Sequence, residues 1–217
     1  MEVLHLTERN EAAVVEAAVQ HLKRGAVLAI PTDTVYGLAS DVRNEMGVKK
    51  VFEIKGRGEN QALPVFVRDI SMAERYAMFD ERARSFLEHV WPGRVSVVLK
   101  KRSGIPDIVT AGQATVALRI PDHPFIEKLL QAYPNPITGT SANISGEPAA
   151  STATDVQISF RDRPSKPDLL IDGGVLPPSS SSTIIDFTNS ANPRILRMGA
   201  VTKGELDEFF AMWDNKK

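Results

Sequence analysis

Segments with helical spacing of apolar residues alternate along the chain with short continuous apolar runs. Residues 10–24 show helical spacing and end at Gly25, whereas residues 27–30 (Val-Leu-Ala-Ile) form a run of strand length that ends at Pro31. Further helices are predicted at residues 48–55, 80–91, 124–130 and 202–213, and further strands at residues 63–67, 95–99, 115–120, 137–140, 169–171, 183–187 and 195–197. This alternation predicts an α/β fold class, and the length fits a single domain covering residues 1–217.

Polar residues mark where some of these elements begin and end. Ser71 with Glu74, and Thr202 with Glu205, have the spacing of capping boxes at helix N-termini. Two stretches rich in turn-forming residues are predicted to be loops: residues 148–155, and residues 173–182 with a Pro-Pro pair and four serines. Neither stretch has the length of a linker between separate domains.

The composition excludes several kinds of site. The chain has no cysteine, which rules out disulfides, thiolate catalysis and cysteine zinc sites. Its four histidines are scattered, so we expect no dedicated metal site, although Mg²⁺ could arrive with a nucleotide. The formal net charge of −1 differs from the basic excess of dedicated nucleic-acid binders. Without a signal-peptide pattern or an apolar run of membrane-spanning length, we expect a cytoplasmic protein with no membrane partner.

Three polar segments have the chemistry of ligand-binding loops. Residues 31–37 (PTDTVYG) follow a buried strand, where α/β sheets bind ligands. Lys55 and Arg57 flank Gly56 at a helix end, a pattern suited to a phosphate. Residues 140–146 (TSANISG) offer hydroxyls and backbone N–H groups to an anion. Each segment has a purely structural alternative, respectively a turn, a glycine-capped helix end and a polar loop, and spacing alone favours that alternative.

Two arginines are also candidates for anion binding. Arg119 shares a predicted strand face with Thr115 and Ala117, and Arg197 ends a short apolar run. An arginine in such a place binds a carboxylate or phosphate, or extends to solvent. Taken separately, neither residue decides between these roles.

The order of these segments resembles the YrdC-like family, the threonylcarbamoyl-AMP synthases, in its short form without the C-terminal extra domain. The matching strings, in order, are PTDTVYGL from Pro31, KGR from Lys55, WPG from Trp91, TVALRIPDHP from Thr115, TSANISGEP from Thr140, IDGG from Ile171, STIIDF from Ser182 and ILRMGAV from Ile195. They span nearly the whole chain, and PTDTVYGL and TSANISG are long and specific. The resemblance implies an α/β fold with an open, twisted, mixed sheet, flanking helices and a large concave cavity.

The resemblance also implies a reaction. The amine of L-threonine takes up CO₂ or bicarbonate to form a carbamate, whose oxygen attacks the α-phosphorus of ATP and releases pyrophosphate. The product, threonylcarbamoyl-AMP, serves tRNA modification, so tRNA and downstream threonylcarbamoyl-transfer proteins are expected partners. An in-line attack at phosphorus depends mainly on positioning and charge neutralisation.

The family pattern assigns roles to individual residues of this sequence. Lys55, Arg57 and Ser141 are the expected catalytic residues, and Thr34, Arg119 and Ser182 are expected to bind threonine, with Arg119 pairing its carboxylate. The expected ATP-binding residues are Lys55, Arg57, Gln61, Thr115, Gly139, Ser141, Asn143 and Arg197. No residue is needed as a covalent nucleophile, and no metal ligand is expected.

The chain departs from the family pattern at a few positions. Gly58, Gln61 and Arg94 stand where the family often has proline, another polar residue and proline. Phe66 occupies a position often held by histidine, so it is expected to alter the wall of the threonine site.

Two other functions are compatible with the resemblance. One is an RNA-binding or ribosome-assembly module, in which a basic groove near Lys55, Arg57 and Arg94 would bind double-stranded RNA or tRNA. The other is a related carbamoyl-AMP-forming enzyme, which ranks last because such proteins carry zinc modules and this chain has no cysteine.

Overall fold

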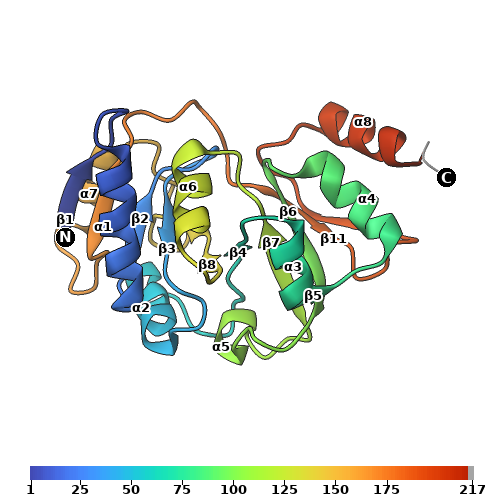
Figure 1. The fold of residues 1–217 in the computed structure, drawn as a ribbon, viewed down its shortest axis with the longest axis horizontal. Helices are drawn as coiled ribbons and strands as arrows, with labels where there is room; N and C mark the ends of the chain where they lie inside the picture. Colours follow the sequence, from blue (N-terminus) through green and yellow to red (C-terminus); the bar gives the residue numbers. More distant parts are fainter. Residues whose placement is uncertain (215–217) are drawn as a thin grey trace.

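The computed structural model describes residues 1–214 and confirms the α/β fold class. The helices in chain order are α1 (Glu11–Lys23), α2 (Glu45–Lys55), α3 (Ile70–Tyr76), α4 (Glu81–Val90), α5 (Asp107–Thr110), α6 (Pro124–Ala132), α7 (Ala153–Phe160) and α8 (Lys203–Asp214). The strands of this part of the chain form two mixed sheets, which lie next to each other in Figure 1. Their junction forms the site described below.

Sheet A lies in the half of the molecule that contains α1. Its strand order is β1 (Glu2–His5), β10 (Leu169–Asp172), β2 (Leu28–Ile30), β3 (Gly37–Ala39) and β9 (Thr140–Ser141). The pairs β1–β10 and β10–β2 are parallel, and the pairs β2–β3 and β3–β9 are antiparallel.

Sheet B lies in the half that contains α4 and α8. Its strand order is β12 (Arg194–Arg197), β11 (Thr183–Asp186), β6 (Val95–Lys101), β7 (Thr115–Arg119), β4 (Val65–Phe66) and β8 (Ile137–Thr138), with β5 (Ala77–Met78) also paired to β6. The pairs β11–β6 and β4–β7 are parallel, and the other pairs are antiparallel.

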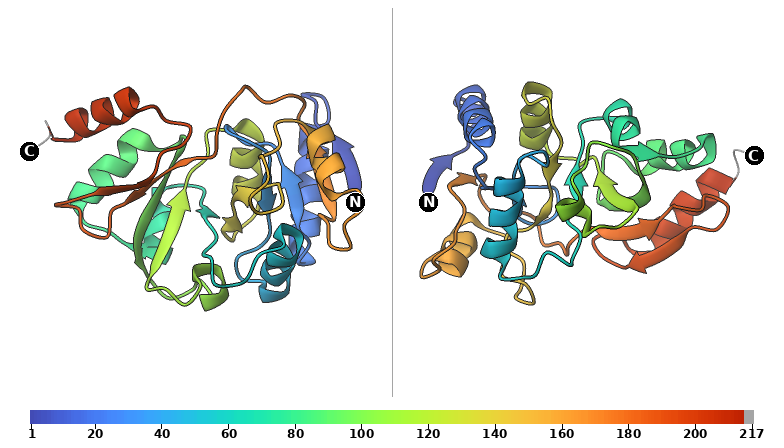
Figure 2. Two further views of the ribbon diagram at one scale, coloured as in Figure 1. Left: turned by 180° about the vertical axis from the view of Figure 1, so that it is seen from behind. Right: turned by 90° about the horizontal axis from the view of Figure 1, so that it is seen from below.

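The core lies on both faces of sheet A, which explains why its central strand is apolar throughout. Leu28 and Ile30 belong to a cluster with α1 and α6, whereas Val27 and Ala29 belong to the cluster on the opposite face. Successive strand residues point to opposite faces, so a strand covered on both sides needs a continuous apolar run. The right-hand view in Figure 2 shows α1 and α6 on one side of the sheet and α7 on the other.

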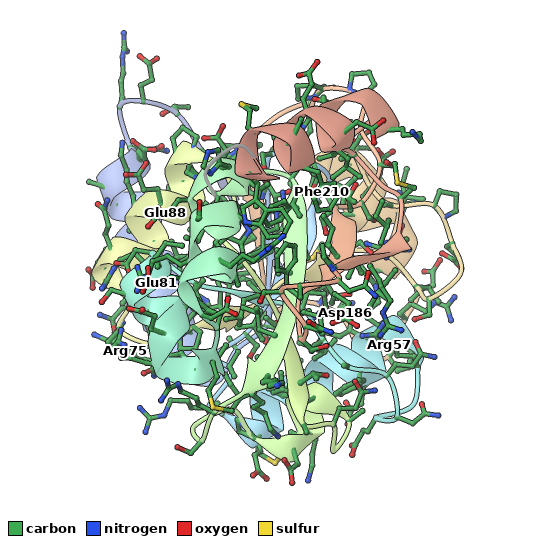
Figure 3. All side chains as sticks on the ribbon, turned by 90° about the vertical axis from the view of Figure 1, so that its right-hand side faces the viewer. Arg57, Arg75, Glu81, Glu88, Asp186 and Phe210 are labelled. Carbon is green, nitrogen blue, oxygen red and sulfur yellow. The ribbon has the colours of Figure 1, made fainter. Side chains whose placement is uncertain are left out.

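An aromatic cluster attaches α8 to α4 and sheet B. The rings of Phe86 and Phe187 stack at 4.4 Å, and Phe210 lies 5.3 Å from Phe86. Figure 3 faces this end of the molecule, with Phe210 beneath α8. The predicted capping box begins this helix: Thr202 Oγ1 accepts from the Glu205 amide at 3.2 Å, and the Glu205 carboxylate accepts from the Thr202 amide at 2.7 Å.

Gly139 joins the two sheets. The chain leaves sheet B after β8 and enters sheet A at β9, with only Gly139 between the two strands. A Cβ atom at this position would lie 2.3–2.6 Å from ring carbons of Phe66, which is itself buried in β4. Glycine is therefore required here by the close approach of a ring rather than by an unusual φ angle.

Some sequence predictions need correction. The run at residues 137–140 is not one strand, because Gly139 separates two strands of different sheets. The N-cap of α3 is Asp69, whose carboxylate accepts from the Met72 amide at 2.6 Å, and not Ser71. The predicted loop at 148–155 contains the start of α7, where Thr152 and Asp155 form a capping box.

Five other elements of the described residues were not predicted from the sequence, namely β1, β3, β5, α5 and α7. Each is short or lies in a stretch without clear apolar periodicity. The three strands among them are defined by their pairing partners rather than by their own sequence. Within residues 1–214 no helix combines the length and apolar character that crossing a membrane would require.

Replacing Gly139 with alanine should lower the free energy of unfolding by about 1–3 kcal/mol, because the added methyl group overlaps the Phe66 ring. Urea unfolding monitored by circular dichroism measures this change. Adding Phe66→Leu should restore part of the loss. The control is Gly204→Ala in α8, where no atom lies within 4 Å of the added methyl group and stability should not fall. Equal effects at the two glycines would contradict the proposed steric fit.

Candidate active site

A cavity of about 610 Å³, counted to its open mouth, lies where the two sheets meet. Its walls come from segments 32–37, 62–66, 139–141 and 181–184, together with Arg57, Arg119 and Arg197. Among the described residues that line it are three arginines and several hydroxyl groups, but no carboxylate. The three arginines of the lining favour an anionic ligand.

Arg119 forms one end of the cavity and is almost completely buried. Its Nε donates to the Gly93 carbonyl at 2.8 Å, Nη2 donates to Asp33 Oδ1 at 2.5 Å, and Nη1 lies 3.4 Å from Thr34 Oγ1. The guanidinium also lies over the Phe66 ring, 5.6 Å from its centroid. Burial lowers the pKa of Arg119, and the Asp33 charge opposes this shift. An arginine remains charged even so, and the geometry of its fork is suited to a carboxylate.

The segment between β2 and β3 folds into a turn that presents Thr34 to Arg119. Thr32 Oγ1 accepts from the Thr34 amide at 3.0 Å and donates to the Val35 carbonyl at 2.8 Å. A threonine hydroxyl commonly closes a turn of this kind. Tyr36 anchors the other side, because its hydroxyl donates to the Gly174 carbonyl and accepts from the Gly173 amide. The segment is therefore a turn, as the structural alternative predicted, and it also lines the cavity; its binding of a ligand stays a prediction.

Lys55 lies behind the cavity wall at the end of α2. Its Nζ donates to the Ser141 carbonyl at 2.7 Å and to the carbonyl and Oδ1 of Asn143, each at 3.0 Å. Gly56 caps the helix in the left-handed conformation with a φ of 60°. Burial, and then the neighbouring Arg57 charge, lower the pKa of Lys55 to about 7. Lys55 thus ties the 141–143 loop to α2.

Arg57 and Arg197 also line the cavity. Among the described residues no acceptor reaches the buried Nε of Arg57, although its Nη2 lies 3.4 Å from the Ala62 carbonyl. Arg197 Nη2 donates to the Ser182 carbonyl at 2.8 Å. Partial burial lowers the pKa of both guanidinium groups. These two cations leave N–H groups available for an anionic ligand.

The cavity brings together most of the residues that the family pattern selected. Its lining includes Thr34, Arg57, Arg119, Gly139, Ser141, Ser182 and Arg197. Lys55 and Asn143 lie directly behind Ser141, whose hydroxyl donates to Asn143 Oδ1 at 2.6 Å.

Two other selected residues also lie outside the cavity lining. Gln61 is exposed on the loop that follows α2. Thr115 pairs with Lys100 at the opposite end of β7 from Arg119, and its hydroxyl contacts Gln113. The basic groove considered for RNA also lacks two of its three cations, because Lys55 is buried and Arg94 pairs with Glu205 at 2.9 Å.

Two functional positions were not selected from the sequence. Asp33 pairs with Arg119, and Thr32 orders the turn that carries Thr34. Both belong to the PTDTVYGL string, so the string itself was the available signal. An ion pair between residues 86 positions apart could not be seen without the fold.

No group of three or more histidine, aspartate or glutamate side chains with metal-binding geometry occurs in the described part of the chain. The cavity chemistry is therefore that of arginines, hydroxyls and backbone groups, which bind and orient anions. Groups of this kind can recognise carboxylates and phosphates.

Comparison with known proteins identifies the family. The sequence model of Sua5, YciO and YrdC proteins, described as "Telomere recombination", matches residues 20–199. The chain belongs to the Sua5/YciO/YrdC family. The resemblance implied an α/β fold with a mixed sheet and a concave cavity. The structure has this fold class, with the strands divided between two mixed sheets that meet at the cavity.

Relatives within the family include two proteins named threonylcarbamoyl-AMP synthase. The one from Pyrococcus abyssi is 34% identical over 207 residues, covering 95% of this chain and 60% of that protein. The one from Bacillus subtilis is 34% identical over 200 residues, which cover 91% of this chain and 56% of that protein. The chain thus spans less than two thirds of the length of either relative. The structure of P. abyssi Sua5 complexed with L-threonine matches with a TM-score of 0.89 at 33% identity, covering 96% of this chain and 61% of that one.

The lowered pKa of Lys55 gives a pH-dependent stability. The folded protein releases this proton near pH 7, whereas the unfolded chain keeps it up to its ordinary pKa of 10.5. Between these values the unfolded state binds more protons, so raising the pH favours the folded state. Below pH 7 both states are protonated and the contribution is constant. The free energy of unfolding of the wild type, minus that of Lys55→Met, should therefore rise between pH 7 and about pH 9.

Urea unfolding at several pH values measures this difference. Lys49→Met is the matched control, since Lys49 is exposed on the same helix and its loss should leave the pH dependence of the wild type unchanged. A difference that stays flat with pH for Lys55→Met would mean that Lys55 keeps its proton in the folded protein.

Proposed function

We propose that the chain is an L-threonylcarbamoyladenylate synthase, which forms threonylcarbamoyl-AMP and pyrophosphate from L-threonine, bicarbonate or CO₂, and ATP. One observation carries the proposal: a cavity whose lining has no carboxylate contains the buried fork of Arg119 and two further arginines. The first feature suits an amino acid carboxylate, and the second suits a nucleotide phosphate chain. The names of the relatives, and the threonine complex of P. abyssi Sua5, support the same activity.

Threonine would bind with its carboxylate at Arg119 and its polar groups near Thr34 and Ser182. The Nε group of Arg119 is already taken by the Gly93 carbonyl, so a two-point contact must use Nη1 and Nη2. The threonine amine would then take up CO₂ to form a carbamate, releasing one proton. Holding both reactants in one cavity converts the next step into an effectively unimolecular one.

ATP would bind in the same cavity, with its phosphates near Arg57, Ser141 and Arg197. A carbamate oxygen attacks the α-phosphorus, the bond to the bridging oxygen breaks, and pyrophosphate leaves with the electron pair. The arginines stabilise the negative charge that develops on the phosphate oxygens. We assign Mg²⁺ to the nucleotide rather than to a protein site.

The other residues of the expected ATP site would act less directly. Lys55 and Asn143 would position Ser141 through the hydrogen bonds described above. Gln61 would reach the phosphates only through a movement of the exposed loop that carries it, and Thr115 would act at a distance from the cavity. A role in tRNA modification in the cytoplasm, with transfer of the product to a partner protein, completes the proposal.

The protein incubated with ATP, Mg²⁺, bicarbonate and L-threonine should release pyrophosphate and form a threonine-containing AMP adduct. Mass spectrometry of the products identifies the adduct, and L-serine in place of threonine tests how strongly Phe66 affects the choice of amino acid. Bicarbonate-free buffer under nitrogen is the control. Pyrophosphate release that is independent of threonine, or a mass without the carbamoyl group, would refute the proposed reaction.

Replacing Arg119 with lysine should raise the KM for threonine by roughly 10–100-fold, the loss expected for one hydrogen bond to a charged group. Lysine keeps the charge beside Asp33 but cannot form a two-point contact with a carboxylate. The KM for ATP should change by no more than about threefold, well below the effect of losing a charged contact. Arg57→Lys should instead raise the KM for ATP and leave the KM for threonine nearly unchanged. Steady-state kinetics with each substrate varied in turn measures both KM values. Equal losses for both substrates at Arg119 would contradict its assignment to threonine.

A further inference from the structure

The buried arginine of the cavity has a buried counter-ion. Asp33 Oδ1 accepts from Arg119 Nη2 at 2.5 Å, and the side chains of Asp33 and Arg119 are 9% and 3% exposed. The other oxygen of Asp33, Oδ2, is buried and has no hydrogen-bond partner in the part of the chain that the structure describes. A buried charge that is only partly hydrogen-bonded acts strongly on its surroundings, because little water screens it.

Asp33 leaves part of the guanidinium free. The five N–H groups of an arginine include one on Nε, which the Gly93 carbonyl takes, and two each on Nη1 and Nη2. Asp33 uses one on Nη2, and Thr34 lies at a long 3.4 Å from Nη1. The remaining N–H groups can hold a ligand carboxylate while Asp33 stays in place. Asp33 therefore need not be displaced when a ligand binds.

The charges around Arg119 sum to about zero before any ligand enters. The Asp33 charge offsets that of Arg119, and the other cation that acts on Arg119 is Arg94, which pairs with Glu205 at 2.9 Å. A simple anion at Arg119 would place a second negative charge close to Asp33 in a poorly screened site. A zwitterion brings its own positive charge and avoids this repulsion.

We propose that Asp33 makes the Arg119 end of the cavity selective for zwitterionic amino acids over simple anions. This inference rests on the proposed function, in which bicarbonate is a co-substrate. Bicarbonate has a planar carboxylate group of the kind that an arginine fork binds, so an uncompensated Arg119 would bind it in place of threonine. Asp33 lowers the affinity of Arg119 for anions without an ammonium group and leaves the site to the amino acid.

Binding rather than turnover tests the proposal, with two probes that differ in one group. The probes are L-threonine and the corresponding 2,3-dihydroxybutyrate, in which a hydroxyl replaces the amine. Isothermal titration calorimetry measures both dissociation constants for each protein, and the quantity compared is the constant for the hydroxy acid divided by that for threonine. In the wild type the hydroxy acid should bind at least about tenfold more weakly, the order expected from one charge pair in a partly buried site.

Asp33→Asn keeps the acceptor oxygen for Arg119 and removes only the charge. In this variant the ratio should fall by about tenfold, and bicarbonate should compete with threonine where it does not in the wild type. The control is Asp122→Asn, which removes a charge from an exposed residue three positions after Arg119 and should leave the ratio unchanged.

The outcomes separate this inference from the proposed function. An equal ratio in the wild type and in Asp33→Asn, or the same fall in Asp122→Asn, would overturn the role of Asp33 alone. A wild type that binds no threonine would instead refute the proposed function. If Asp33→Asn does not fold, the wild type still decides, because a hydroxy acid that binds as tightly as threonine would contradict the selectivity.

Discussion

The ion pair between Arg119 and Asp33 is the constraint on which the cavity depends. A guanidinium that is 3% exposed is stable only if its N–H groups find acceptors and its charge finds a partner. Gly93, Asp33 and Thr34 meet these needs from two separate segments. The need to satisfy Arg119 thus fixes the turn of the PTDTVYGL segment against the end of β7. The same contacts hold the guanidinium at the edge of the cavity.

A second constraint is the passage of the chain from one sheet to the other at Gly139. The absence of a side chain there allows the Phe66 ring to lie against the backbone and under Arg119. Phe66 therefore belongs to the wall of the cavity beside Arg119. Lys55 supports another part of the cavity wall, because its Nζ donates to the Ser141 and Asn143 carbonyls from the side away from the cavity. The cavity is built by residues that face it and by residues that hold those in place.

The sequence predicted the parts of this arrangement that have local signals. Apolar runs such as residues 27–30 identified the buried strands, and helical spacing identified α1, α4 and α8. Most of the residues that the family pattern selected line the cavity, including Arg119 and Ser182.

Features that depend on distant contacts could not be predicted in this way. The Asp33–Arg119 pair joins residues far apart in the chain, and the division of the strands into two sheets follows from pairings that periodicity does not specify. The family pattern also treats Lys55 and Thr115 like the residues that face the ligand. Only the fold separates a buried lysine behind the wall, and a threonine at the far end of β7, from the cavity itself.

A crystal structure with L-threonine and a non-hydrolysable ATP analogue bound tests the central claim most directly. The account predicts that the threonine carboxylate contacts Nη1 and Nη2 of Arg119 while Asp33 remains paired with Nη2. It also predicts that the nucleotide phosphates lie beside Arg57 and Ser141. Threonine bound away from Arg119, or Asp33 displaced from the guanidinium by the carboxylate, would contradict the account.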